Sequence, residues 1–147
     1  MDNPLTKMLY DGAFSCNLES PLYGYTYPWL KNEELCSLFS AKKQFRLNAR
    51  RGGCEDIPYD FIFIGHTHIP FYRSLQKLKV VNPGSVGQPR DGDFRASATL
   101  LDVDEESVKF IRIAYDVEKV ITELKLLIDD SKFLDMSIAL LKYGKLL

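Results

Sequence analysis

Long apolar runs are missing from this 147-residue sequence, since no stretch approaches the roughly 18 consecutive apolar residues that a membrane-spanning helix needs. The first residues, Met1-Asp2-Asn3-Pro4, also lack the basic region and apolar run that are typical of a signal peptide. These two absences exclude an obvious membrane anchor. They predict a cytoplasmic protein that does not bind a membrane.

Cysteine is sparse, with three residues at Cys16, Cys36 and Cys54. The number is odd, the spacing is wide and there is no C-x-x-C pair, so the sequence indicates neither a disulfide framework nor a zinc knuckle. We therefore expect reduced thiols, which fits a reducing cytoplasm.

An excess of charge of either sign is also absent. Lys and Arg together number 19 and Asp and Glu number 20, which gives a net charge of -1. Without a basic field, non-specific binding to nucleic acid or to an anionic membrane is disfavoured. The local cluster of Arg46, Arg50 and Arg51 either binds phosphate or is a solvated charge run.

The composition that remains, 46% hydrophobic and 27% charged, is that of one globular domain, and we expect residues 1–147 to form a single domain. Apolar residues recur at helical spacing in some segments and as short buried runs in others. The expected helices run from an N-cap at Asn32 to about Gln44, from an N-cap at Asp116 to about Ile128, and from Phe133 to Leu141. The expected strands are Tyr59–Ile64, Phe71–Leu75, Leu78–Val81, Ala96–Val103 and Ser107–Ile113.

Four aromatic residues lie within Tyr23–Trp29, a segment that also contains glycine and proline and is expected to form a loop. Large apolar side chains in a loop need a surface to pack on. The segment therefore either folds onto the protein's own core or marks an interface.

The only two histidines, His66 and His68, lie two residues apart directly after the expected strand Tyr59–Ile64. If the extended conformation continues there, side chains two apart point to the same side and both imidazoles can reach one metal cluster. Gly65 permits backbone conformations closed to other residues. Spacing alone leaves two interpretations open, metal binding or ordinary hydrogen bonding, because catalytic zinc sites have three or more ligands.

A second polar loop follows the expected strand Leu78–Val81. It begins with Asn82-Pro83-Gly84-Ser85 and continues through Gln88-Pro89-Arg90-Asp91-Gly92-Asp93. Two polar loops thus leave two strands of the expected sheet, and both can line one cleft.

The segments Gly65-His66-Thr67-His68, Val80-Val81-Asn82-Pro83-Gly84-Ser85 and Gly87-Gln88-Pro89-Arg90-Asp91 together resemble the C-terminal signature of the calcineurin-like metallophosphoesterases, in their small bacterial and archaeal phosphodiesterase branch. The resemblance covers roughly residues 18–147. It implies the C-terminal half of a four-layered α/β/β/α sandwich, with a mostly antiparallel or mixed sheet and flanking helices. It also implies hydrolysis of phosphomonoesters or phosphodiesters at a dinuclear centre of Mn, Fe, Zn, Ni or Mg.

The resemblance implies a role for each of five polar residues. His66 and His68 would each ligate one of the two metals, and a bridging water would be the nucleophile. Asn82 and Ser85 would shape the loop and orient the histidines rather than bind metal. Arg90 would either contact the substrate phosphate or form a surface salt bridge.

The family's other ligand motifs, Asp-x-His, Gly-Asp-x-x-Asp and Gly-Asn-His, do not occur in the sequence, and Cys16-Asn17-Leu18-Glu19 stands where a His-Gly-Ser-Pro-like segment is expected. Two imidazoles hold a metal weakly, so we expect the lone chain to be weak or inactive as a phosphoesterase. The chain is then a fragment, a homo-oligomer, or one subunit of a split enzyme whose partner is a complementing N-terminal half. The alternative from another functional class is a non-catalytic interaction module.

Overall fold

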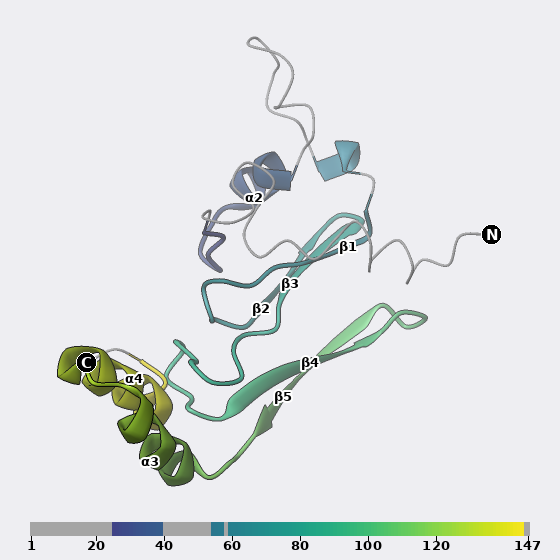
Figure 1. Cartoon of the computed structure of the whole chain (residues 1–147). Helices are drawn as coiled ribbons and strands as arrows, with labels where there is room; N and C mark the ends of the chain where they lie inside the picture. The colour runs from purple at the N-terminus through teal and green to yellow at the C-terminus, as the bar shows by residue number, and fades with distance from the viewer. Residues whose placement is uncertain (1–24, 40–53, 58, 146–147) are drawn as a thin grey trace. The chain divides into compact units, whose positions relative to one another are not determined.

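The computed structural model describes residues 25–39, 54–57 and 59–145. They fall into two compact units. Unit 1 comprises the described residues through Thr67 together with Phe71–Asn82, and unit 2 comprises His68–Pro70 and the described residues from Pro83 onward. Both units combine strands with helices, so the predicted mixed α/β class with flanking helices is confirmed (Figure 1). Among the described residues, no helix is both long and apolar enough to cross a membrane.

Unit 1 is built on a three-stranded mixed sheet in the order β1-β3-β2. Strands β1 (Phe61–Phe63) and β3 (Leu78–Asn82) are parallel, and β2 (Phe71–Leu75) pairs with β3 in the antiparallel sense. Every residue of β3 is buried, as expected for a central strand. The remaining elements of unit 1 are helix α2 (Asn32–Phe39) and a short 3₁₀ helix, η2 (Cys54–Asp56).

The β2–β3 hairpin forms although its turn, Gln76-Lys77, lacks the Asn-Gly signal of tight hairpins. Gln76 takes the positive φ that such a turn requires, at 56°. Leu75 and Leu78, which flank the turn, are 3% and 0% exposed. Burial of these two leucines thus fixes a turn that local sequence preference does not favour.

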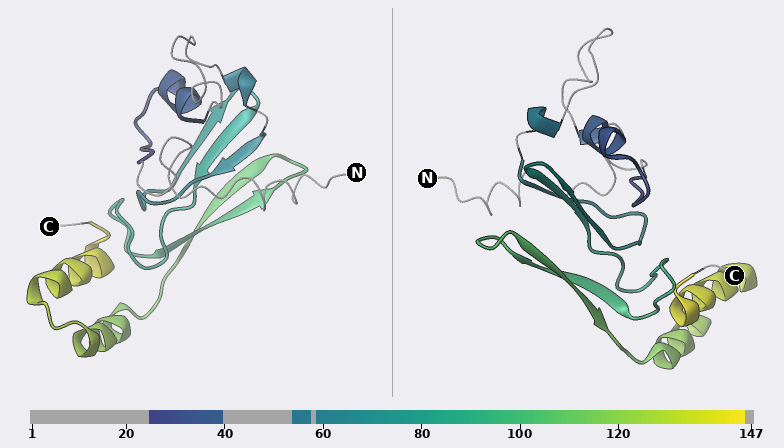
Figure 2. Two further views of the ribbon diagram at one scale, coloured as in Figure 1. Left: turned by 45° about the horizontal axis from the view of Figure 1, so that its top comes forward. Right: turned by 180° about the vertical axis from the view of Figure 1, so that it is seen from behind.

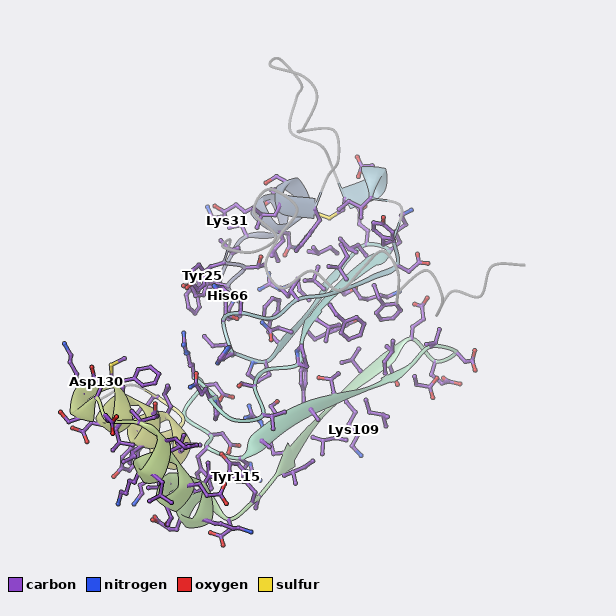
Figure 3. The ribbon with its side chains drawn as sticks, viewed as in Figure 1. Tyr25, Lys31, His66, Lys109, Tyr115 and Asp130 are labelled. Atoms are coloured by element: carbon purple, nitrogen blue, oxygen red, sulfur yellow. A yellow bond between two sulfur atoms is a disulfide. The ribbon has the colours of Figure 1, made fainter. Side chains whose placement is uncertain are left out.

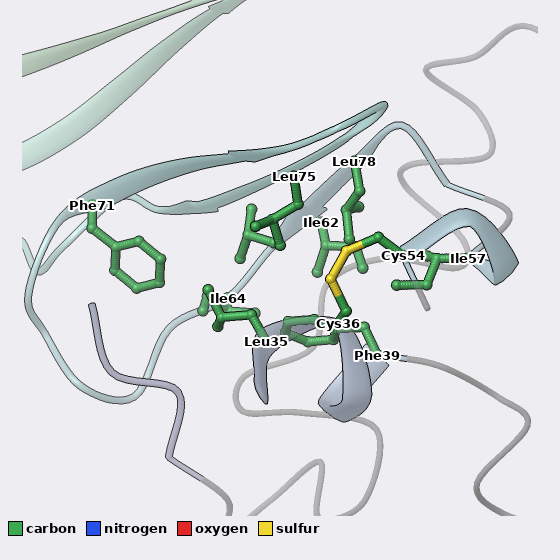
Figure 4. Packing of buried hydrophobic residues seen from close by; sticks show 11 residues of the cluster. Leu35, Cys36, Phe39, Cys54, Ile57, Ile62, Ile64, Phe71, Leu75 and Leu78 are labelled. Atoms are coloured by element: carbon green, nitrogen blue, oxygen red, sulfur yellow. A yellow bond between two sulfur atoms is a disulfide. The ribbon is translucent and has the colours of Figure 1, made fainter. Parts of the chain in front are cut away.

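The core of unit 1 lies between α2 and one face of this sheet (Figure 4). Leu35 and Phe39 project from α2, at 0% and 1% exposure, against Ile62 and Leu78 of the sheet. Their i, i+4 spacing is the periodicity from which the helix was predicted.

The prediction that Asn32 is the N-cap of this helix is wrong. The helix begins at Asn32 itself. The backbone N–H of Lys31 donates to Glu34 Oε2 at 2.8 Å. Lys31 thus occupies the N-cap position, and this bond is one of the two that form a capping box. The Asn32 side chain instead accepts from Arg73 at 2.9 Å, so an interaction with β2 takes it away from the helix end.

The prediction of reduced thiols is also contradicted, because a disulfide joins Cys36 to Cys54. The two residues are 18 apart in sequence, but α2 and η2 bring their Cα atoms to 4.8 Å. Both cysteines are buried in the unit 1 core, where Figure 4 draws the bond beside Ile57.

The regular elements of unit 2 are a two-stranded antiparallel ribbon, β4 (Ala96–Asp102) and β5 (Ser107–Ile113), followed by helices α3 (Val117–Leu127) and α4 (Ser131–Tyr143) (Figure 2). The predicted N-cap at Asp116 is confirmed, since its carboxylate accepts from the Lys119 N–H at 3.0 Å. Asp130 caps α4 in the same way through the Phe133 N–H.

The C-terminal end of α4 packs closely on the loop before β4. The carbonyl of Gly144 accepts from the Gly92 N–H at 2.9 Å, and a Cβ at Gly144 would lie 2.8 Å from the backbone of Asp93. Arg112 of β5 ties the same loop down through ion pairs with Asp91 and Asp93.

Candidate functional site

His66 and His68 follow β1 at the carboxyl end of the strand, but the chain is not extended there. Both residues have positive φ, 69° for His66 and 60° for His68. The condition on which their common direction was predicted therefore does not hold. Left-handed backbone at non-glycine residues is uncommon and tends to occur at functional sites, where surrounding contacts maintain it.

His68 is fixed by the second polar loop. Its Nδ1 lies 2.8 Å from the carbonyl oxygen of Gln88, and its own carbonyl accepts from the Arg90 N–H at 3.2 Å. Because a carbonyl oxygen can only accept, Nδ1 of His68 is the donor in this contact, and in the neutral imidazole Nε2 then has the lone pair. Metal-ligating histidines are typically held in this way, with one ring nitrogen donating to a carbonyl and the other free for the ion. The expected proximity of His68 to the loop after β3 is thus observed.

The turn that contains Gln88 is held by Ser85. The backbone N–H of Gln88 donates to Ser85 Oγ at 3.0 Å, which closes a turn over Ser85–Gln88. Ser85 is therefore connected to His68 indirectly, through Gln88.

Asn82 organises the backbone on either side of His66. Its side-chain amide is fully buried and donates to the Gly65 carbonyl at 3.2 Å and to Thr67 Oγ1 at 2.9 Å. Asn82 thus holds the histidine loop, Gly65–His68, from the end of β3 through the residues on either side of His66.

His66 contacts an aromatic stack. Its ring centroid is 4.2 Å from that of Tyr25, at an interplanar angle of 48°, and the two side chains lie together in Figure 3. Tyr25 stacks on Tyr27, which stacks on Trp29 with centroids 4.5 Å apart. Trp29 is 67% exposed, so the aromatic residues described here do not fold into the core. Arg73 holds their segment by donating to the carbonyls of Pro28 and Leu30.

Arg90 is exposed, and within the described part of the chain its guanidinium has no ion-pair partner. Its backbone is held beside His68 while its side chain stays available to an anion. The predicted cluster Arg46, Arg50 and Arg51 lies outside the described residues.

A dinuclear centre needs more ligands than this loop supplies. Across residues 25–39, 54–57 and 59–145, no group of three or more histidine, cysteine or acidic side chains could hold an ion together. The imidazoles of His66 and His68 are suitable nitrogen donors, but two donors do not complete even a structural or catalytic zinc site. The described residues therefore do not fit a complete dinuclear centre by themselves.

The family is decided by sequence comparison. Residues 29–106, which include α2, the whole unit 1 sheet and both polar loops, match the profile of the calcineurin-like phosphoesterase superfamily domain. The chain belongs to this superfamily. A curated relative, an uncharacterized protein of Methanocaldococcus jannaschii, is 39% identical over a 75-residue alignment that covers 41% of this chain and 31% of the relative.

Two solved structures share the fold. A hypothetical protein from Pyrococcus horikoshii OT3 matches with a TM-score of 0.68 and 20% identity, over 92% of this chain and 46% of its own. A metallophosphoesterase from Sphaerobacter thermophilus matches with a TM-score of 0.66 and 22% identity, over 91% of this chain and 56% of its own. The chain thus spans about half the length of these solved relatives and less of the curated one.

Two contacts of the site were missed by reasoning from the sequence. The contact between His68 and Gln88 involves a backbone carbonyl, which leaves no signal in residue identity. Tyr25 belonged to an aromatic segment that was noted, but its contact with His66 spans 41 positions that no local pattern connects.

Proposed function

We propose that this chain contributes His66 and His68 to a metal-dependent phosphoesterase site that hydrolyses phosphomonoesters or phosphodiesters. The observation that carries the proposal is the 2.8 Å contact between His68 Nδ1 and the Gln88 carbonyl, which presents Nε2 as a ligand. Membership of the phosphoesterase superfamily supports the reaction class. His66 would be the second ligand, from the same loop.

The residues of this chain would have distinct roles in the site. Gln88 holds the His68 ring, Ser85 holds the turn that contains Gln88, and Asn82 holds the backbone around His66. Arg90 would neutralise charge on the substrate phosphate, for which a planar guanidinium is well suited. Divalent ions such as Mn, Fe, Zn, Ni or Mg, when bound, would activate water and stabilise the charge of the phosphoryl group.

The remaining ligands would come from another chain, because the family's other ligand motifs do not occur in this sequence. A complementing N-terminal half of the family fold, or a second copy in a homo-oligomer, are the two sources that we consider. The coverage of only 46% and 56% of two solved relatives favours the first.

The experiment is reconstitution. The 147-residue chain should hydrolyse an aryl phosphodiester negligibly in excess Mn²⁺, whereas co-expression with the N-terminal half of a full-length relative should restore turnover. In that complex, His66→Ala and His68→Ala should each abolish turnover, and Lys109→Ala, at an exposed position of β5 remote in sequence from either motif, serves as the control. Restored turnover that survives the double histidine variant would contradict the proposal.

The aromatic stack favours a second candidate, a non-catalytic interaction module. Tyr25 and Trp29 are 47% and 67% exposed, and aromatic side chains are enriched at interfaces. If this function is the correct one, reconstitution should fail while Trp29→Ala weakens capture of a partner protein.

A cytoplasmic location is also part of the proposal. The Cys36–Cys54 disulfide is the observation that opposes it, because disulfides are rare in reducing compartments. Counting free thiols in protein alkylated within intact cells distinguishes the two cases.

A further inference from the structure

Three aromatic side chains of unit 1 form one continuous stack, the aromatic stack, which comprises Tyr25, Tyr27 and Trp29. The planes of Tyr25 and Tyr27 are inclined by 7° and those of Tyr27 and Trp29 by 13°, so all three rings are nearly parallel. Thr26, between the first two, is fully buried, as expected where alternate side chains face opposite sides. The rings are therefore on the outer side of the segment, where Trp29 is 67% exposed.

Polar contacts hold the segment that carries the stack. Arg73 of β2 donates to the Pro28 carbonyl at 2.6 Å and to the Leu30 carbonyl at 3.3 Å. The Leu30 N–H donates to the Tyr27 carbonyl at 3.3 Å. A ligand that binds a surface fixed in this way pays less conformational entropy than one that must first order a free loop.

One end of the stack lies at the proposed phosphoesterase site. The Tyr25 ring contacts the His66 ring, with their centroids 4.2 Å apart, and Figure 3 shows the two side chains together. His66 and the aromatic stack all belong to unit 1. A substrate whose phosphate is held near His66 therefore has the stack beside the group that is bonded to that phosphate.

The extent and the shape of the exposed apolar surface indicate the kind of occupant. Among the described residues of unit 1, the exposed large apolar side chains are Tyr25, Trp29 and Tyr72, too few for the apolar centre of a stable protein interface. Nearly parallel rings that end in an exposed indole match one planar π system instead. Bases and aryl rings stack on aromatic side chains of this kind whatever their other substituents.

We propose that the aromatic stack binds a planar ring on the alcohol side of the substrate, so that the substrates are phosphoesters of nucleosides or of other alcohols that carry an aromatic ring. Trp29 provides the stacking face, Tyr27 packs against its other face, and Tyr25 connects the stack to His66. The identification of the ring as part of a substrate rests on the proposed phosphoesterase function. Binding of the ring itself does not.

The chain contains one tryptophan, so its fluorescence reports directly on Trp29. The full chain, with no metal added, is titrated with adenosine monophosphate, phenyl phosphate and ribose 5-phosphate, with excitation at a wavelength that none of them absorbs. At least one of the two ring-bearing phosphates should change the fluorescence along a saturation curve. Ribose 5-phosphate, which has the phosphate but no aromatic ring, should not. The tighter of the two ring-bearing phosphates decides between a nucleobase and a simple aryl group.

Matched substitutions locate the binding, with affinities measured by NMR titration of isotope-labelled protein. Trp29→Leu should weaken the ring-bearing phosphate about 5- to 100-fold, because the stacking face is lost. Trp29→Phe should keep most of the affinity, since a phenyl ring still offers a face. Tyr72→Leu, at a 40% exposed aromatic residue of β2, should not change it. Circular dichroism checks that each variant keeps its secondary structure.

The reconstituted enzyme tests whether the ring belongs to a substrate. Trp29→Leu should lower kcat/KM for an aryl phosphodiester about 5- to 100-fold, chiefly by raising KM, and Tyr72→Leu should not. If reconstitution gives no turnover while the fluorescence titration saturates, the phosphoesterase function fails and ring binding stands.

Three results would overturn ring binding itself. The first is that neither ring-bearing phosphate saturates, and the second is that Tyr72→Leu weakens binding as much as Trp29→Leu. The third is that the N-terminal half of a full-length relative shifts the Trp29 emission to the blue and prevents the ring-bearing phosphate from binding. The aromatic stack would then be a protein interface.

Discussion

The side-chain amide of Asn82 donates to Thr67 Oγ1 at 2.9 Å, and both side chains are buried at the base of the histidine loop. Asn82→Leu keeps the volume but removes the donor to the buried Thr67 Oγ1, whereas the Gly65 carbonyl still accepts from the Thr67 N–H. We expect a loss of about 1–3 kcal/mol in the free energy of unfolding, measured with urea.

Thr67→Val offers the matched control, because it removes only the acceptor in an almost isosteric side chain. If the two side chains act through one bond, the double variant should cost less than the sum of the single variants. Strict additivity would contradict the bond between them.

Gly84 is held where a side chain does not fit. Its φ is +86°, and a Cβ built there would lie 2.8 Å from Ser97 Cβ and Oγ. Gly84→Ala therefore combines backbone strain with overpacking. Gly92 has nearly the same φ, +87°, but nothing within 4 Å of the added carbon, so Gly92→Ala isolates the strain.

The free energies of unfolding of these two variants should separate the cost of backbone strain from the cost of overpacking. Gly92→Ala should cost about 1–2 kcal/mol, the usual penalty for a left-handed non-glycine residue. Gly84→Ala should cost about 1–3 kcal/mol more, because buried contacts must shift. Equal losses would show that Ser97 moves aside freely.

The strands were predictable from the sequence because burial on one or both faces leaves a local pattern. Phe71–Leu75 and Ser107–Ile113 were predicted with the observed bounds, and the other strands differ from prediction by a few residues at their ends. The Asn32 cap was mispredicted for a physical reason: Arg73, 41 residues away, competes for its side chain. Local preference carries no information about such a competitor.

The candidate site was only partly predictable. Two histidines after a buried strand are visible in any reading of the sequence. Their positive φ angles, the Gln88 carbonyl that fixes His68 and the disulfide between α2 and η2 all depend on tertiary contacts. Backbone groups and conformations of this kind have no residue signature, so they become visible only in the structure.

The Cys36–Cys54 disulfide should stabilise unit 1 measurably. Closing a loop with a sequence separation of 18 restricts the unfolded chain, which is worth about 3 kcal/mol in the chain-entropy account. Reductant should therefore lower the urea midpoint of the native chain. Cys36→Ala/Cys54→Ala should be less stable from the outset and should not respond to reductant. A native chain with three reactive thiols and no response to reductant would contradict the disulfide.

Asp93 should make unit 2 sensitive to acid. Hydrogen bonds from Arg95, first from its side chain and then from its backbone, lower the pKa of Asp93 from 3.8 to about 2, with smaller contributions from the charges of Arg95 and Arg112. Because the folded-state pKa lies below the unfolded value, the ionised carboxylate stabilises the fold above about pH 4. That stability is lost as the pH falls towards 2. Asp93→Asn should remove it at neutral pH and flatten the pH dependence of unfolding between these limits.

A variant of Arg95 tests whether this residue lowers the pKa of Asp93. Its guanidinium donates to Asp93 Oδ2 at 2.6 Å, and 47% of the Arg95 side chain is exposed, so Arg95→Gln should leave packing intact while raising the pKa of Asp93. The carboxyl carbon shift of Asp93, followed by NMR from pH 2 to 6, reports this pKa directly. In Arg95→Gln the midpoint should move up towards 3.8, and adding Asp93→Asn should cost little further stability. An unchanged midpoint would show that Arg112, which also ion-pairs with Asp93, is the residue that holds the carboxylate ionised.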